Sequence, residues 1–206
     1  MKKVILILLA FLVLVLGAAF VLPIIYKDEI KAKLEQEVAK QVDAKVYFDA
    51  DGFSVSLFRH FPNITASLRD FGMVGKDEFR ADTLLAVPKF EITVDIMSVI
   101  SGKKIKVKAI DLESPKVLAK VLKTGKANWD IYRADTTATT VDTAQSAVSV
   151  GIDQWSVKNA TIIYDDRSLP MFAKLVNLNH NGSGDFEQDI FDMVSRTTID
   201  SLTVVY

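Results

Sequence analysis

From residue 46 onward, hydrophobic and polar residues alternate with a period of two, which is typical of β-strands that bury one face. This alternation predicts strands at 46–50, 53–57, 64–68, 84–96, 104–109, 117–122, 152–164, 171–178 and 197–206. The parity of the pattern swaps at Asp51-Gly52, which indicates a β-bulge or a tight turn. Pro88 interrupts the fourth segment and suits an edge strand or a bulge. The polar residues 179–185 predict a turn before the last strand.

The N-terminal segment has a different pattern. Val4–Ile25 is a run of 22 residues without a charge. As a helix it reaches about 33 Å, enough to cross a hydrocarbon core of about 30 Å. We therefore predict a transmembrane anchor over 1–26, with the following domain outside the cytoplasm. A cleaved signal peptide, processed near Gly17-Ala18-Ala19, is the alternative, and it also exports the rest of the chain.

Two further segments depart from the strand pattern. Over 27–43 the apolar residues recur every four positions, at Ile30, Leu34, Val38 and Val42, which predicts one amphipathic helix. This helix could pack on the edge of the following sheet or lie in the membrane interface. Residues 133–149 are rich in Thr, Ala, Asp and Ser and have no period, as in a linker or a long surface loop.

These elements predict a mainly β protein in four parts: the anchor (1–26), the helix with a first β-domain (27–132), the linker (133–149) and further strands (150–206). With one candidate helix available to cover the strands, the apolar sheet faces need another partner. A second sheet could bury them as a sandwich. Alternatively, one curved sheet could leave its apolar face open as a trough, which would be a binding surface. The alternation also continues to Tyr206, so we expect the chain to be a piece of a longer protein.

Composition and charge remove several classes of function. The chain has no cysteine, two histidines and a formal net charge of −1. A disulfide framework, a cysteine nucleophile and a structural zinc site are therefore excluded, and a nucleic-acid partner is not expected. His60 and His180 are far apart and are read as ordinary surface or turn residues. We expect no enzyme activity, no metal and no cofactor.

Several motifs, in this order and spacing, resemble the N-terminal region of the AsmA-like family. They are SLFRHFPNI at 56–64, LRDF at 68–71, VGK at 74–76, DTLL at 82–85, IDLESP at 110–115, GKANWDI at 125–131 and, more loosely, TIIYDD at 161–166. The resemblance implies an envelope protein of Gram-negative bacteria, anchored in the inner membrane, with a β-rich body in the periplasm. Relatives in the AsmA and TamB group resemble bridge-type lipid transfer proteins, in which a long taco-shaped β-groove holds acyl chains. The implied fold is an elongated, curved antiparallel sheet.

The resemblance also implies a function and its partners. Phospholipid acyl chains and the inner membrane are the expected partners, in phospholipid transport and outer-membrane biogenesis. Family members usually run several hundred residues further, so complete transport by 206 residues is not expected. A periplasmic scaffold that recruits outer-membrane assembly proteins by strand addition is the alternative. The side chains predicted to bind lipid are Phe48, Phe53, Val55, Leu57, Leu68, Phe90, Ile92, Val94 and Ile96.

Overall fold

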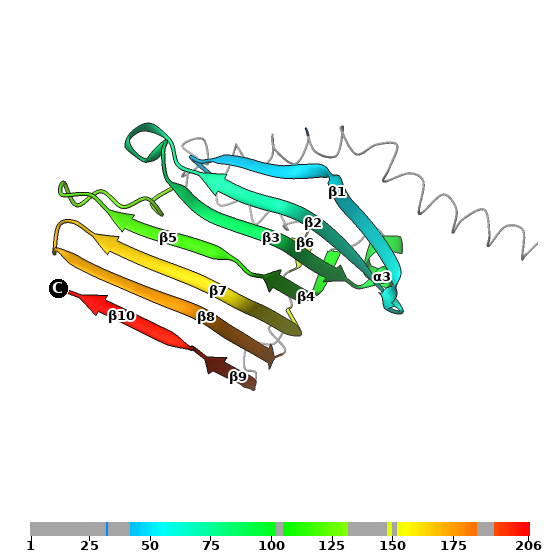
Figure 1. The fold of residues 1–206 in the computed structure, drawn as a ribbon. Coiled ribbons are helices and arrows are strands. Elements are labelled where there is room, and N and C mark those ends of the chain that lie inside the picture. The colour runs from blue at the N-terminus through cyan, green and yellow to red at the C-terminus, as the bar shows by residue number, and fades with distance from the viewer. Residues whose placement is uncertain (1–31, 33–41, 102–104, 132–147, 150–151, 185–191) are drawn as a thin grey trace, which may run out of the picture.

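The computed structural model describes residues 32, 42–101, 105–131, 148–149, 152–184 and 192–206, which form a predominantly β structure (Figure 1). The elements are β1 (Lys45–His60), β2 (Asn63–Val74), η1 (Asp77–Phe79), β3 (Thr83–Val94), α3 (Ile96–Ile100), β4 (Ile105–Glu113), β5 (Lys116–Val121), β6 (Val148–Ser149), β7 (Gln154–Asp166), β8 (Met171–Gly184), β9 (Met193–Thr198) and β10 (Ser201–Val205). The prediction of a mainly β protein with few helices is confirmed for this part of the chain.

All described strands belong to one sheet, which has ten strands in the order β1-β2-β3-β4-β7-β8-β10, with β5, β6 and β9 attached to this path. The described residues therefore contain no second sheet to make a sandwich. The prediction of an antiparallel sheet is wrong in part. Strand β7 runs parallel to β4 and β5, and β6 runs parallel to β4, whereas the other pairs are antiparallel. A parallel neighbour requires a long crossover connection, which alternation within single strands does not reveal.

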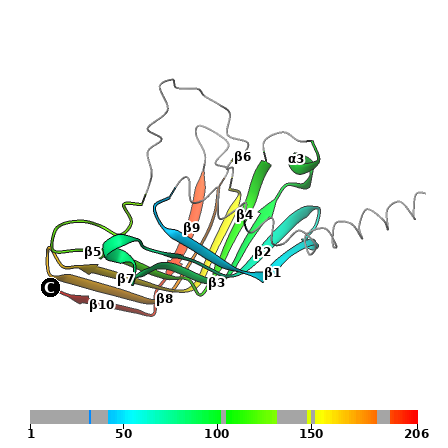
Figure 2. The same ribbon diagram turned by 90° about the horizontal axis from the view of Figure 1, so that it is seen from above.

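A crease crosses the sheet where each strand carries an irregular residue in its middle. Non-glycine residues with positive φ stand there in β2, between β4 and β5, in β7 and in β8: Asp70, Ser114, Asn159 and Asn177, with φ between 49° and 54°. Asp and Asn tolerate this left-handed conformation better than most residues do. Pro88 in β3 and the Ile199-Asp200 junction between β9 and β10 continue the same line. Figure 2 shows the consequence: the strands bend together, and β4 and β9 run at a steep angle to β5 and β10.

The crease divides the sheet into two arms. The first arm contains β4, β9 and the adjoining halves of the longer strands, and it carries the β1–β2 turn and α3. The second arm contains β5, β10 and the remaining halves. At the crease, each strand changes parity: if even-numbered residues point to one face before the crease, odd-numbered residues point to that face after it. Phe71 pairs with Val87 in the second arm, yet its ring stacks on Phe90 of the first arm, with the ring centroids 5.5 Å apart. Phe90 and Val87 therefore share a face.

This change of parity corrects one expectation from the sequence. Leu84 and Ala86 have the same parity as Phe90 but lie beyond Pro88, so they point to the opposite face. Two segment ends also differ from the prediction. Strand β3 ends at Val94, and Ile96 begins the short helix α3. Strand β8 continues to Gly184 through the predicted turn, because 179–184 pair with β9.

Three predictions from the sequence lie mainly outside the described residues: the anchor over 1–26, the amphipathic helix over 27–43 and the linker over 133–149. Among the residues that the structure describes, no helix is both long and apolar enough to cross a bilayer. The last two residues of the predicted linker form β6, and β7 follows it; both join the same sheet as the strands before the linker.

The turn between β7 and β8 is built around the carboxylate of Asp166. This carboxylate accepts hydrogen bonds from the Ser168 hydroxyl (2.6 Å), the Ser168 and Leu169 backbone N–H groups (2.8 and 3.0 Å) and the Tyr164 hydroxyl (2.9 Å). These donors, the Ser168 hydroxyl foremost, lower the pKa of Asp166 from 3.8 to about 2. The carboxylate is therefore held in its charged form by the turn that it organises.

The turn is expected to weaken in acid. Because the pKa of Asp166 is about 2 in the folded protein and 3.8 ordinarily, its stabilising effect is complete above pH 3.8 and is lost as the pH falls toward 2. An Asp166→Asn variant is expected to be less stable at neutral pH and to lose less stability on acidification. Urea unfolding of both proteins at neutral pH and at low pH measures this difference. An equal loss in both proteins would show that Asp166 does not carry the acid response.

Candidate functional site

One face of the sheet is apolar across the whole second arm. Cross-strand partners point to the same face of a sheet, so a series of paired residues traces a row. One such row crosses all seven strands of this arm and contains only apolar residues: Val46, Met73, Leu85, Val117, Ile162, Leu175 and Leu202. We call the face that carries this row the apolar face.

The apolar face continues into the first arm. A row there runs through Val55, Ala66, Ile92, Ile110, Trp155, Gly182 and Ser195, and a second through Leu68, Phe90, Leu112, Val157, His180 and Thr197. Both rows are apolar on β1 to β7 and become polar toward β9. Gly182 is required where it stands, because a side chain there would collide with the Trp155 ring. The crease joins the two arms on this face through the Phe71–Phe90 stack and the buried residues Val87, Pro115 and Ala160.

The opposite face of the first arm is polar. One of its rows crosses seven strands through Ser54, Ser67, Glu91, Asp111, Ser156, Asn181 and Arg196. Glu91 is 8% exposed and accepts a hydrogen bond from the Ser67 hydroxyl (2.6 Å). It also forms ion pairs with Arg59 and with Lys89 (3.2 Å), so its buried charge is compensated. This face is built to lie against water, whereas the apolar face is not.

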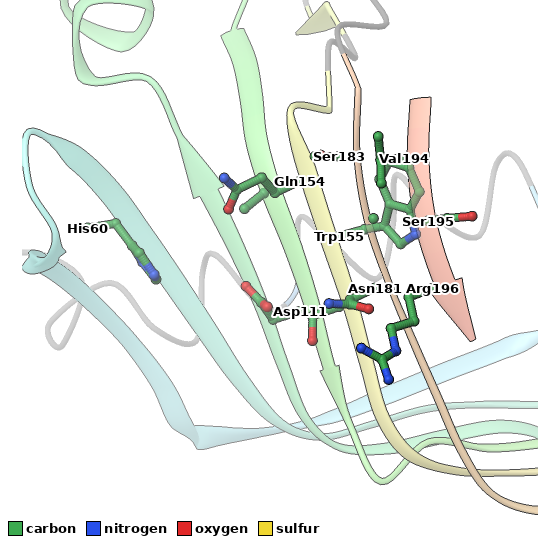
Figure 3. A pocket seen from close by; sticks show the side chains of 12 residues that line it. His60, Asp111, Gln154, Trp155, Asn181, Ser183, Val194, Ser195 and Arg196 are labelled. Carbon is green, nitrogen blue, oxygen red and sulfur yellow. The ribbon is translucent and has the colours of Figure 1, made fainter. Parts of the chain in front are cut away.

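A hollow of about 410 Å³ lies on the first arm (Figure 3). Asp111, Gln154 and Asn181 project into it from neighbouring strands, and His60 projects from the end of β1 on the far side. The Nδ1 atom of His60 is 2.9 Å from the Thr65 hydroxyl, which is itself 3.0 Å from the Thr93 hydroxyl. His60 is thus part of a hydroxyl network at the β1–β2 turn. Among the described residues, no group of acidic and histidine side chains could hold a metal ion.

The loop that follows β5 lies on the inside of the bend (Figure 2) and covers part of the apolar face. Its Trp129 ring stacks on Tyr164 of β7, with the centroids 6.2 Å apart. Asn128, 1% exposed, anchors the loop: its amide accepts from the Lys120 N–H (2.9 Å) and donates to the Leu118 carbonyl (2.7 Å). Tyr164 lies two residues after Ile162 in β7 and therefore points to the apolar face. Because Tyr164 contacts this loop, the apolar face lies on the inside of the bend.

The structure brings most of the predicted lipid-binding residues together. Cross-strand pairs place Val55, Leu68, Phe90, Ile92 and Val94 on the apolar face, and alternation with Ser54 places Phe53 there. The side chain of Phe48 points to the opposite side of β1 from Asp49, which pairs with Arg69. Only 5% of Phe48 is exposed, so it has little surface left for a ligand. Ile96 lies in α3 and not on the sheet. The side chain of Leu57 lies outside the described residues.

The sequence prediction missed the second arm of this face. The row through Val117, Ile162 and Leu175 continues the surface that Phe90 and Ile92 begin. Alternation was visible in each of these strands, but the parity change at the crease hid which residues share a face with those of the first arm. Most side chains of the face are only half buried, and besides Pro115 only eight apolar residues among the described ones are buried outright. The apolar face is therefore not sealed as a sandwich core is.

The chain was also compared with known proteins. The model of the AsmA family matches residues 1–199, nearly the full length of the chain. No curated protein matches the chain.

Proposed function

Since the chain belongs to the AsmA family, an envelope-associated family, we propose that it is anchored in the inner membrane by 1–26 and that its β-sheet binds lipid in the periplasm. The observation that carries this proposal is the continuous apolar face on the inside of a bent single sheet. Acyl chains would lie across the rows through Ile92 and Ile162, and the headgroups would remain in water. This is a groove module for phospholipid movement and outer-membrane biogenesis.

The energetics favour such a ligand. Each methylene withdrawn from water contributes about 0.8 kcal/mol, so ten methylenes against the apolar face contribute about 8 kcal/mol before the cost of ordering the chain. A half-buried apolar surface gains by accepting hydrocarbon, whereas the polar face, with its compensated charges at Glu91, would lose. Binding of this kind needs no cofactor and no bond-breaking step.

Photocrosslinking tests the proposal directly. A photoreactive amino acid at Phe90 or Val94, on the apolar face, is expected to form phospholipid adducts in intact bacteria. The same amino acid at Lys106, on the far side of β4 from Val107, is the control and is expected to form none. Mass spectrometry of the gently extracted protein should detect co-purifying phospholipid. Adducts of equal yield at Phe90 and Lys106, or no adduct at any position, would contradict a lipid-binding groove.

One observation favours the alternative function, a scaffold for outer-membrane protein assembly. Strands β9 and β10 pair only with β8 among the described residues, and every residue from 192 to 206 is exposed. An exposed strand edge is a template for adding a strand from another protein. A photocrosslinker at Thr203 on β10 would then give a discrete protein adduct, whereas Ile163, paired on both sides within the sheet, would not. The alternative function, a scaffold without lipid cargo, is supported only if a protein adduct forms at Thr203 and no lipid adduct forms at Phe90.

A further inference from the structure

The turns at the free end of the first arm expose large apolar side chains to water. Phe61 in the β1–β2 turn is 80% exposed, and Met97 and Ile100 in α3 are 66% and 69% exposed. The two turns lie at the same end of the sheet, because Ile64 and Val94, the residues next to them, are cross-strand partners (Figure 1). We call Phe61, Met97 and Ile100 the end patch.

Hydrogen bonds at both ends hold α3 in place. The Asp95 carboxylate accepts from the Ser98 N–H (2.7 Å), and the Ser98 hydroxyl donates to the Asp95 carbonyl (2.6 Å) and accepts from the Lys106 N–H (3.0 Å). The Ser101 N–H donates to the Met97 carbonyl (3.0 Å). Met97 and Ile100 are three residues apart and so share one face of the helix. The turn thus presents two apolar side chains on one side of a short, hydrogen-bonded helix, as an interfacial apolar contact needs.

We infer that the end patch docks into the surface of a phospholipid bilayer. Three side chains expose far less than the roughly 1,200 Å² of surface that a stable protein interface buries. They are enough to add to an existing membrane anchor, since interfacial binding scales with the apolar area inserted. The patch also adjoins the Ile64–Val94 pair, the last pair of the apolar face at this end. A lipid leaving the bilayer here would meet hydrocarbon-binding surface at once.

The tether between the anchor and the sheet reaches this far only when part of it is extended. The 18 residues from Lys27 to Ala44 span about 27 Å as a helix and up to about 65 Å when extended, so an unbroken helix over 27–43 requires β1 to lie at a slant to the bilayer. The 16 residues of β1, which end at the patch, span about 50 Å. The inference rests on the proposed anchoring by 1–26 but not on lipid binding by the sheet.

The experiment uses the full chain, which has no cysteine of its own. Met97→Cys and Ile100→Cys each receive an environment-sensitive nitrobenzoxadiazole label, and the protein is reconstituted in vesicles of phosphatidylethanolamine and phosphatidylglycerol. Leu169→Cys is the matched control, because Leu169 is 70% exposed in the β7–β8 turn at the opposite end of the sheet. We expect blue-shifted emission and quenching by nitroxide-labelled acyl chains at 97 and 100, and neither effect at 169.

The outcomes separate this inference from the proposed function. Emission at 97 and 100 as aqueous as that at 169 would overturn docking, and so would equal quenching at all three positions. Retention in the vesicles after an alkaline wash reports the anchor alone, and lipid adducts at Phe90 report the groove alone. A Phe61→Ser/Met97→Ser/Ile100→Ser variant should fold, because its changes are exposed. In this variant, a fluorescent label at Asn63→Cys should become accessible to an aqueous quencher, whereas the same label in the unsubstituted end patch should be protected.

Discussion

Replacing Ile162 with aspartate is expected to abolish lipid co-purification, whereas replacing its neighbour Ile163 is expected to leave it unchanged. Ile162 pairs with Val117 and Leu175 in the apolar row of the second arm. A carboxylate there would have to lose its water whenever an acyl chain lies across the row. If four methylenes are displaced at about 0.8 kcal/mol each, binding weakens by about 3 kcal/mol, more than a hundredfold.

Ile163→Asp is the matched control. Ile163 is the next residue of the same strand, is also half buried and pairs with Leu118 and Lys174 on the opposite face. Both variants add one charge to the same strand, so a general loss of folding would affect both. The measurement is phospholipid bound per protein after gentle extraction, with circular dichroism to check the fold. Equal lipid content in the two variants would show that the apolar face of the second arm does not contact lipid.

The alternation of residues predicted the strands well because most strands have one mainly apolar and one more polar side within an arm. Asp51-Gly52 was correctly identified as an irregularity, and the register of β1 against β2 shifts between Asp49 and Ser54. Pro88 also marked a true irregularity, at the crease. What a single strand could not reveal is that the irregularities of neighbouring strands align in one line. That alignment depends on register between strands, which is a property of the assembled sheet.

The same limit explains the errors at the candidate site. The predicted residues of the first arm share a face because parity is constant there: Phe53, Val55, Leu68, Phe90, Ile92 and Val94. Ile96 kept the parity of its strand but follows Asp95, whose carboxylate caps a helix and ends the strand. The second arm escaped prediction because an irregular residue in each strand reverses the parity, and the alternation of Ile162 and Ile163 does not reveal which of them faces Phe90.

The crease itself is expected to depend on residues that accept a positive φ. Asn159 in β7 has φ of 54°, and its N–H donates to the Asn179 side-chain oxygen (3.0 Å). In Asn159→Val, a β-branched side chain would be forced into this conformation, at a cost of about 2 kcal/mol. For a chain of this size the melting temperature should fall by about 6 °C. In Asn159→Gly the left-handed conformation costs nothing, so stability should be kept or slightly raised.

Ser156→Val separates this effect from the general effect of valine on the strand. Ser156 lies three residues before Asn159 in β7, in regular strand geometry between Asp111 and Asn181, and its substitution should change stability by less than about 0.5 kcal/mol. If the left-handed residues hold the bend, the glycine variant melts at or above the temperature of the parent, and the valine variant melts well below both. An Asn159→Val variant as stable as the parent would mean that β7 can straighten at no cost. The apolar faces of the two arms would then be joined by packing alone, through Phe71 and Phe90.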